Sequence, residues 1–325
     1  MERIQAISEY IVSNYNIVDL LDIELLADEG NSVFRISNEQ QQYIFRLYAI
    51  EKSIEVIKSE IELLSFLSDR GLNVESPIRN SNGIYNSIII LNNSVRNCAM
   101  YKELNGIIYD EILTHEQAIQ FGLFIGKLHN TLDLYTGQNS FKKFGYEEIV
   151  WMPLQTIQPY IQHNNELMEF YKTIITECES KLRKCDGLLS WGICHGDLHA
   201  GNVVFNEFSE PGIFDFDLSC NGWRLYDLAT VIWSILPRED YSQNTLKIVD
   251  ICIKSFVKGY SNNRPLAREE HELLFIFVLL RHIWRQAVRI AFENAVEWTS
   301  EQHFIVQMNR MKKWIEIYEI NIGSN

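Results

Sequence analysis

The spacing of apolar residues changes near residue 100, and this change limits the possible folds more than any other feature of the chain. Before it, short segments rich in β-branched and aromatic residues alternate with turn formers, which is typical of strands. The expected strands cover residues 24–27, 33–36, 43–48, 84–91 and 95–101. After it, apolar residues recur at the spacing of three and four that indicates helices. The pattern predicts a small sheet-rich N-terminal lobe and a larger helical C-terminal lobe.

The helical stretches can be bounded from the same spacing. They cover residues 2–15, 53–69, 165–184, 223–235, 243–260, 268–293 and 301–318, and a short strand-like stretch spans residues 193–216. A further helix starts at Thr114, which is followed three residues later by Gln117 as in a capping box. The length of 325 residues suits two domains. We expect an N-terminal lobe at 1–101, a hinge at 102–106 and a C-terminal lobe at 107–325.

Charge and composition exclude some classes of partner. Hydrophobic residues make up 46% and charged residues 22%, as in a globular protein with a large core. The net charge of −14 disfavours nucleic-acid binding and an anionic membrane surface. It is compatible with a cationic small molecule, although solubility alone explains an acidic surface equally well.

Cysteine usage and hydropathy point to a cytoplasmic protein. The six cysteines form no C-x-x-C pair and no zinc-ligand spacing, so they indicate a reducing compartment. The N-terminus has no apolar signal-peptide core. The longest apolar run, residues 273–280, ends at Arg281 and is far short of the roughly 20 residues that cross a bilayer.

The segment from His195 to Asp217 carries the clearest chemistry. Asp197 and Asn202 lie five residues apart around a glycine-containing loop, so both side chains can face one cavity. Asp215 is expected on a second short strand that pairs with the first as a hairpin. Phosphoryl transfer from a magnesium nucleotide needs a carboxylate that orients or deprotonates the hydroxyl, and oxygen ligands for Mg²⁺. The alternatives are a chance loop or a zinc site on the two histidines, for which no third ligand has suitable spacing.

Residues 195–202 read H-G-D-L-H-A-G-N, and residues 213–217 read I-F-D-F-D. This segment resembles the aminoglycoside phosphotransferase and choline kinase-like family, whose signature is H-G-D-x-H-x-x-N followed by an I-D-F/W-D/E strand. The resemblance implies an α+β, bilobal protein-kinase-like fold with a small antiparallel-sheet N-lobe and a mainly helical C-lobe. It implies Asp197 as the catalytic base or hydroxyl-orienting group. It also implies Asn202 and Asp215 as Mg²⁺ ligands and Asp217 as an outer-sphere metal contact.

The same resemblance assigns supporting residues around the loop. His195 and His199 would brace it by hydrogen bonds, with His199 also near the phosphates as a catalytic residue. Residues 226–229 read Y-D-L-A, a family pattern in which the aspartate, here Asp227, holds the catalytic loop from the start of a helix.

A nucleotide-binding lobe of this family needs a turn over the phosphates, a basic residue on the third strand and a helix glutamate. Residues 28–35 resemble the family's short phosphate loop, with Ser32 as a phosphate contact. Arg46 stands where the family usually has lysine, and both residue types can hold phosphate. Residues 60–72 match the pattern E-L-x-x-L-x-x-L-x-x-x-G-L with one exchange of Leu for Ile, which makes Glu60 the expected partner of Arg46. The alternative for Glu60 is a solvated helix face.

Residues 98–106 resemble the family's hinge, where backbone groups near Tyr101 and Glu103 would bind the adenine edge. The implied cofactors are therefore ATP and Mg²⁺. The acceptor is less defined. Arg281, Arg285 and Arg289 form one helical stripe. This stripe is either an anion site or, as charge stripes usually are, a solvated face paired with acids such as Glu293 and Glu297.

Three functions remain open from the sequence. The first is an O-phosphotransferase acting on a small-molecule hydroxyl of an aminoglycoside-like, amino-alcohol, homoserine-like or sugar compound. The second is a protein Ser/Thr kinase, and the third is a nucleotide-binding protein without activity. The intact Asp197, Asn202 and Asp215 argue against the third. The short stretch 218–225, which leaves little room for an activation loop, favours the first.

Overall fold

The computed structural model describes residues 2–15, 17, 20–91, 93–108, 112–137, 140–292 and 295–322. These residues form two compact units. The first unit contains Met1–Ile108, Leu134–Phe141 and Val203–Asp217, and the second contains Tyr109–Asp133, Lys142–Asn202 and Leu218–Asn325. The segment that ends at Asp217 thus belongs with the N-terminal sheet. The lobe boundaries expected at residues 101 and 106 stay a prediction.

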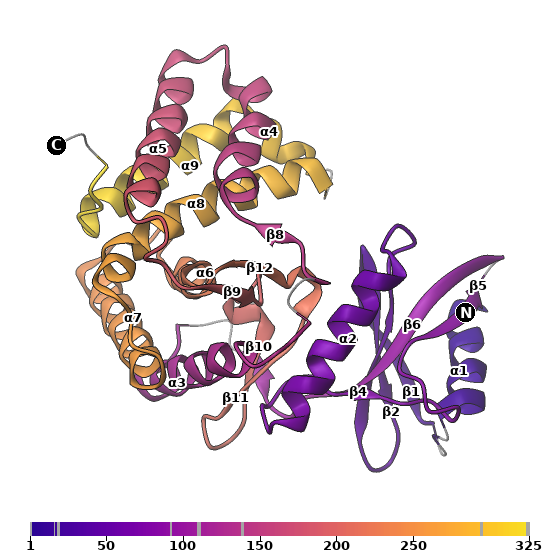
Figure 1. Cartoon of the computed structure of the whole chain (residues 1–325). Helices are drawn as coiled ribbons and strands as arrows, with labels where there is room; N and C mark the ends of the chain where they lie inside the picture. The colour runs from indigo at the N-terminus through magenta and orange to yellow at the C-terminus, as the bar shows by residue number, and fades with distance from the viewer. Residues whose placement is uncertain are drawn as a thin grey trace. The chain divides into compact units, whose positions relative to one another are not determined.

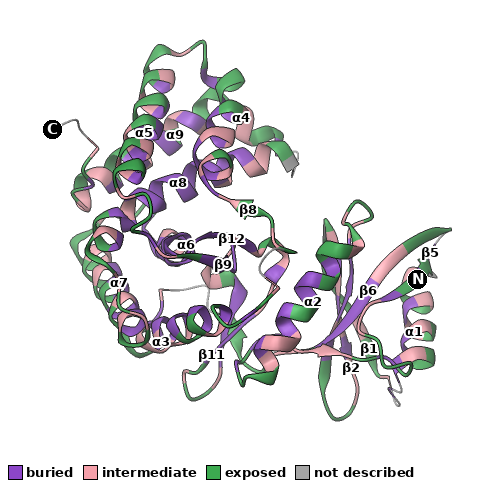
Figure 2. Ribbon diagram, in the orientation of Figure 1, coloured by how far each residue is buried: buried purple, intermediate pink, exposed green. Residues whose placement is uncertain are grey.

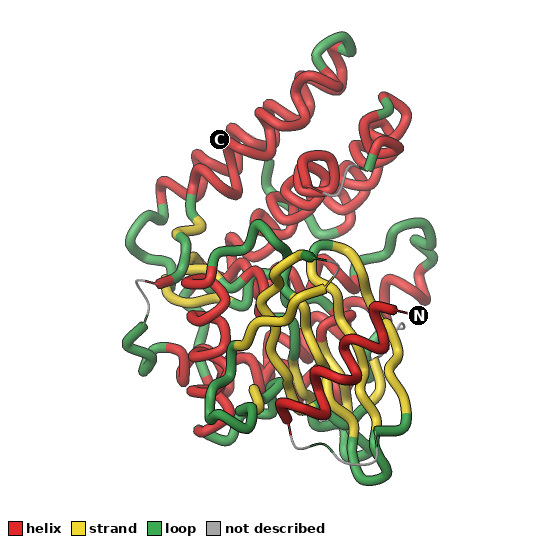
Figure 3. The backbone as a smooth tube through the Cα atoms, turned by 90° about the vertical axis from the view of Figure 1, so that its right-hand side faces the viewer, coloured by secondary structure: helices red, strands yellow, loops and turns green. Residues whose placement is uncertain are grey.

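An antiparallel sheet forms the centre of the first unit (Figure 1). Its order is β1 (Asp22–Glu29), β2 (Asn31–Ser37), β3 (Gln42–Leu47), β6 (Ser94–Lys102) and β4 (Pro77–Ile78), with β5 (Ser87–Leu91) also paired to β6. Helix α1 (Glu2–Tyr15) lies across one face of the strands (Figure 3). Its Ile7 and Ile11 join a buried apolar cluster with Phe34 and Phe45.

Helix α2 (Ile54–Asp69) lies on the opposite face of this sheet. Successive strand residues point to opposite faces, so Phe45 enters the α1 side while Arg46 pairs with Glu60 of α2. Ser53 caps α2 by accepting a hydrogen bond from the Val56 N–H. The alternation of side chains along β3 therefore places Arg46 on the face of the sheet that carries α2, opposite the apolar cluster.

A small antiparallel sheet completes the first unit. Its order is β11 (Pro211–Ile213), β10 (Val203–Phe205) and β7 (Ile107–Ile108). The predicted hairpin is present, but Asp215 does not lie on its second strand. The strand ends at Ile213, because the backbone turns through a left-handed conformation at Asp215, with φ +66°. The short helix η4 (Phe216–Leu218) follows.

The second unit is mainly helical. Its elements are α3 (His115–Leu132), η2 (Glu147–Trp151), α4 (Met152–Ile161), α5 (Asn165–Lys184), η3 (Ala200–Asn202), α6 (Leu225–Ile235), α7 (Gln243–Asn263), α8 (Arg268–Phe292), η5 (Val296–Thr299) and α9 (Glu301–Ile317). A small sheet of β8 (Lys143–Phe144), β12 (Cys220–Trp223) and β9 (Trp191–Cys194) joins them. Buried residues concentrate along α6 and the middle of α8 (Figure 2).

The α+β fold class with an antiparallel sheet is confirmed. The capping box of Thr114 and Gln117 is present at the start of α3, and α5 has the predicted bounds. The helix expected from Trp223 was placed too early. Trp223 ends strand β12, where it pairs with Trp191, and α6 starts at Leu225.

None of the described helices is long and apolar enough to cross a membrane. The six cysteines, all within the described residues, are free thiols.

Candidate active site

The loop after β9 carries Asp197 and depends on a glycine. Gly196 has φ +85°, and a Cβ at this position would lie 2.1 Å from the carbonyl oxygen of Leu218. A side chain is therefore excluded both by the conformation and by the neighbouring backbone. The tight passage lets the chain leave the strand at Cys194 and present Asp197 within three residues.

Asp227 in the first turn of α6 holds this loop, as expected from the sequence. Its Oδ2 accepts a hydrogen bond from the His195 N–H at 2.8 Å, and its Oδ1 accepts one from the Gly196 N–H at 2.9 Å. Burial opposes ionisation of the fully buried Asp227. The hydrogen bond with His129, at 3.1 Å, is the largest of the effects that outweigh it, and together with His195 and the Gly196 N–H it keeps the pKa of the carboxyl below its usual value.

His129 on α3 is a further residue of this network, and sequence reasoning missed it. Its Nε2 faces Asp227 and its Nδ1 lies 3.0 Å from the Tyr260 hydroxyl. Burial lowers the pKa of His129 to about 4, so the ring is neutral at physiological pH. The position is 98 residues from Asp227 along the chain, and no local pattern marks it.

Arg281 pairs with Asp197. Its Nη2 donates to Oδ1 of Asp197, and its Nη1 donates to the Tyr226 hydroxyl at 3.0 Å. The guanidinium is fully buried and lies over the rings of Trp233 and Trp284, 5.2 and 4.7 Å from their centroids. Burial opposes ionisation of Asp197, but Arg281 is the main reason that the pKa of this carboxyl is lowered.

This pairing corrects the interpretation of the arginine stripe. Arg281 does not lie on a solvated face, because it is buried in the middle of α8. Its acidic partner is Asp197 rather than Glu297, and Glu293 lies outside the described residues. Arg289, further along the stripe, stacks on Trp298 at 4.8 Å from the ring centroid.

His199 and Asn202 complete the loop. His199 Nε2 lies 3.6 Å from Oδ2 of Asp197, and its Nδ1 accepts a hydrogen bond from the Gly201 N–H at 3.0 Å. The second contact leaves the proton of the neutral ring on Nε2, which faces the carboxylate. Asn202 donates from Nδ2 to the Asp197 carbonyl at 3.0 Å, so its amide oxygen is the atom that could bind a cation.

In the first unit, six charged residues form a group that we call the Arg46 cluster. Its members are Arg46, Lys52, Glu60, Glu75, Asp215 and Asp217. Two cations and four carboxylates give a formal charge of −2 when every group is ionised. The cluster joins strand β3, helix α2 and the segment after β11.

Arg46 forms the ion pair with Glu60 that the sequence indicated. Its Nη1 donates to Glu60 at 2.6 Å, and its Nη2 donates to both carboxylate oxygens of Glu75 at 3.1 Å. Glu60 does not lie on a solvated face, since it is buried. Burial raises the pKa of Glu60 to about 7, against the opposing effect of Arg46 and Lys52.

Sequence reasoning missed Glu75 and Lys52. Glu75 also accepts a hydrogen bond from the Asp215 N–H at 2.9 Å, which fixes the turn after β11. Lys52 donates from Nζ to Glu60 at 2.7 Å and to Asp217. Burial opposes ionisation of Asp217, but Lys52 outweighs it and lowers the pKa of that carboxyl. A lysine just ahead of an expected helix was the available signal, and it is too common to single out.

The expected phosphate loop is a tight β1–β2 turn in which Glu29 pairs with Asn31 and Gly30 has φ +67°. Ser32, the second residue of β2, is buried beside this turn and pairs with Asp28. Hydrogen bonds from Arg3 and Ser32 lower the pKa of Asp28 to about 2.

The residues expected at the hinge are strongly engaged within the first unit. Tyr101 is fully buried, with its hydroxyl against that of Tyr48. Glu103 accepts a hydrogen bond from Arg35 Nε at 2.9 Å. The Glu103 N–H donates to the Gln42 carbonyl at 3.3 Å. Contact of this segment with a nucleotide stays a prediction.

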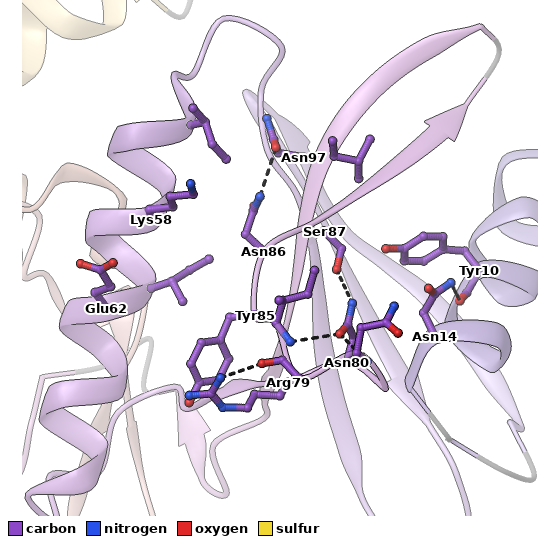
Figure 4. Close-up of a pocket in the computed structure, with 16 residues that line it drawn as sticks. Tyr10, Asn14, Lys58, Glu62, Arg79, Asn80, Tyr85, Asn86, Ser87 and Asn97 are labelled. Carbon is purple, nitrogen blue, oxygen red and sulfur yellow. Dashed lines mark hydrogen bonds between the residues drawn. The ribbon is translucent and has the colours of Figure 1, made fainter.

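A cavity of about 940 Å³ lies elsewhere in the first unit (Figure 4). Lys58 and Glu62 of α2, Tyr10 of α1 and several asparagines line it, and the predicted site residues do not. Among the described residues no group of three or more His, Cys, Asp or Glu side chains is arranged to hold a metal ion. A metal would therefore need further ligands, such as an amide or phosphate oxygen.

The comparisons with known proteins agree on one family. The profile "APH: Phosphotransferase enzyme family" matches residues 22–248, well over half of the chain. The chain belongs to this phosphotransferase family. The predicted resemblance and the class of enzyme, a kinase or phosphotransferase, are thereby confirmed.

Several relatives of this phosphotransferase have informative names. The homoserine kinase of Bradyrhizobium sp. (strain ORS 278) is 24% identical over 296 residues, which cover 88% of this chain and 83% of the relative. A microcompartment-associated aminopropanol kinase superposes with a TM-score of 0.76 at 18% identity, over 98% of this chain and 100% of the other. Amicoumacin kinase hAmiN, in complex with AMP-PNP and Ca²⁺, superposes with a TM-score of 0.71 at 20% identity. The match covers 95% of this chain and 93% of the other. The structural likeness shows the shared fold.

Proposed function

We propose that this phosphotransferase moves the γ-phosphate of ATP to a hydroxyl of a small molecule, with Asp197 as the group that orients that hydroxyl and accepts its proton. The observation that carries the proposal is the state of Asp197. Arg281 keeps the carboxylate ionised, and Asp227 holds the loop through two backbone N–H groups. A fixed, charged acceptor suits a reaction that depends on positioning and electrostatics.

The lowered pKa of Asp197 limits its strength as a base. A carboxylate beside a guanidinium is a weak base, so it does not strip the proton from a free alcohol in advance. In a loose phosphoryl-transfer transition state the hydroxyl becomes acidic only late. Asp197 therefore holds the hydroxyl by accepting its hydrogen bond and takes the proton as the new bond forms. His199 Nε2–H, facing the same carboxylate, supports this orientation.

The donor atoms on the chain fit Mg²⁺, which prefers oxygen ligands. The amide oxygen of Asn202 and the carboxylate of Asp215, whose side chain is 43% exposed, would hold it, with Asp217 as an outer contact. The Arg46 cluster sets four carboxyl groups against two cations, an excess of oxygen donors that suits a divalent cation. When bound, the metal would neutralise charge on the transferring phosphoryl group. The complex of a structural neighbour with AMP-PNP and Ca²⁺ supports this pairing of nucleotide and metal.

The acceptor that we favour is a small alcohol bearing an amino group. Homoserine kinase, aminopropanol kinase and amicoumacin kinase are named for small molecules, and the net charge of −14 suits a cationic compound. A protein substrate is disfavoured because only residues 218–219 separate Asp217 from strand β12, which starts at Cys220. The cytoplasmic location stays a prediction.

ADP release from Mg-ATP in a coupled assay tests the proposal, with a panel of amino alcohols, homoserine, sugars and aminoglycosides as acceptors and a generic protein alongside. We expect turnover with at least one small alcohol. D197A should lower kcat by about 10³-fold or more with nucleotide affinity retained. D250N, which changes an exposed aspartate on α7, is the matched control and should retain activity. Transfer only to protein, or full activity of D197A, would contradict the proposal.

A further inference from the structure

The two cations of the Arg46 cluster differ in how they are held. The Arg46 side chain is 4% exposed, and its Nη1 and Nη2 atoms are used by Glu60 and by both oxygens of Glu75. Its Nε is buried as well. If Arg46 turned to another anion, it would leave the buried Glu75 without a counter-charge and Glu60 with Lys52 alone, which is the costly way to break a buried ion pair.

Lys52 is held more loosely. It lies in the short connection between β3 and α2, and its side chain is 12% exposed, three times the value of Arg46. Its Nζ bridges the buried Glu60 and the carboxylate of Asp217, whose side chain is 31% exposed. The pair of Lys52 and Asp217 is more open than the pairs of Arg46, so solvent screens it more and exchanging its partner costs less. The ammonium group also has three donors and a flexible stem, so it can keep Glu60 and turn another donor outward.

The polar surroundings of Lys52 fit this role. Tyr48 lies beneath it, with the ring centroid 4.9 Å from Nζ, which supports the cation from the buried side. Asp217, on the more open side of Lys52, is the predicted outer metal contact. A magnesium nucleotide that bound there would bring phosphate oxygens close to Lys52. Lys52 is thus the cation of the cluster that can meet a phosphate without uncovering a buried charge.

We propose that Lys52, rather than the strand residue Arg46, is the side chain that binds the nucleotide phosphates in this protein. Arg46 then acts as the buried cation that holds Glu60 and Glu75 in place. The inference rests on the proposed function and deepens it, because it moves the phosphate contact from the third strand, where lysine is expected, to the start of α2.

Calorimetric titration of the full chain with ADP and with adenosine, both in EDTA, tests the inference without relying on turnover. The variants are K52M, K52R and K58M. Lys58 is an exposed lysine six residues further along the chain, and it lines the separate cavity of Figure 4. We expect K52M to weaken ADP binding at least tenfold with adenosine affinity unchanged, K52R to restore most of the ADP affinity, and K58M to match the wild type. Thermal unfolding of each variant identifies any loss of folded protein.

The outcomes separate this inference from the proposed function. If the wild type binds ADP, and K52M either binds it equally well or loses ADP and adenosine by the same factor, Lys52 is not a phosphate contact and the inference fails alone. If the wild type binds neither compound, the inference and the nucleotide part of the proposed function fail together. Should K52M be unstable, an equal loss of ADP affinity in the charge-retaining K52R would still count against a phosphate contact through the cation.

Discussion

The guanidinium of Arg281 donates a hydrogen bond to Oδ1 of Asp197, and Oδ2 of the same carboxylate faces His199. Arg281 is itself held by the Tyr226 hydroxyl and lies over the rings of Trp233 and Trp284. A cation that is fixed from several sides gives the proposed proton acceptor one orientation and keeps it charged. The same cation lowers the proton affinity of the carboxylate, so precise placement of the hydroxyl matters more than strong basicity.

Replacing Arg281 should therefore change both the rate and its pH dependence. Without the guanidinium, burial raises the pKa of Asp197, and the acid limb of the kcat profile moves to higher pH. We expect R281M to lower kcat by about 10²-fold and R281K to recover part of the loss. Steady-state kinetics between pH 5 and 8 measure both. R268M, a change of an exposed arginine on the same helix, is the control, and an unshifted acid limb in R281M would refute the argument.

The outcome for Arg281 also shows what the sequence could and could not predict. The loop that carries Asp197 and Asn202 was visible because its residues are close in the chain and their spacing is fixed by one tight turn. Arg281 is 84 residues from Asp197, and its partner depends on how α8 packs, which periodicity does not contain. Read only as a stripe of charge, it was assigned either to an anion site or to a solvated face. Its neighbours Tyr226 and Trp284 became informative only once the fold brought them together.

The same limit applies to the first unit. Glu60 was found because its register with a downstream glycine is local. Glu75 lies in an irregular stretch between α2 and β4 and was missed, as was Lys52. Short strands and helix starts were predicted well where caps or alternation mark them, as at Thr114. Asp215 was misplaced onto a strand because the sequence does not reveal its left-handed backbone.

Glu75 offers a test of stability in the first unit. It neutralises part of the buried Arg46 and accepts the Asp215 N–H, so its removal leaves the Nη2 group of Arg46 and a backbone donor without their hydrogen-bond acceptor, while Glu60 still pairs with Arg46. We expect E75A to lower the free energy of unfolding by about 1–3 kcal/mol. E75Q, which keeps an acceptor for Asp215, should lose less. Urea unfolding followed by circular dichroism measures both, and equal stability of E75A and the wild type would show that the pair contributes little.

Gly196 gives a prediction about the loop itself. An alanine would carry its Cβ to 2.1 Å from the Leu218 carbonyl oxygen, and it would have to adopt φ +85°. The left-handed conformation alone costs about 1–2 kcal/mol for an L-residue, and the clash forces the loop away from Asp227. G196A should therefore lose most activity and some stability. G187A is the control, because Gly187 also has positive φ but open space around it, and it should lose stability without losing activity.

His129 makes the stability of the second unit depend on pH. Its pKa is lowered to about 4 by burial, against about 6.5 in the unfolded chain. Above pH 6.5 both states hold a neutral ring. Between pH 6.5 and 4 the unfolded chain binds a proton that the folded chain refuses, so stability falls as pH falls, by up to about 3 kcal/mol. Glu60, whose pKa is raised to about 7, acts in the opposite direction between pH 7 and 4.5.

The difference between wild type and H129Q isolates the contribution of the histidine, because Glu60 titrates in both proteins. Glutamine can still donate to Asp227 but does not titrate. We expect H129Q to be less stable than the wild type at pH 7.5, where the hydrogen bonds of His129 with Asp227 and Tyr260 are intact. The gap should narrow as pH falls toward 4.5. Urea unfolding at pH 7.5, 6, 5 and 4.5 measures the gap, and a constant difference would mean that His129 does not titrate on unfolding.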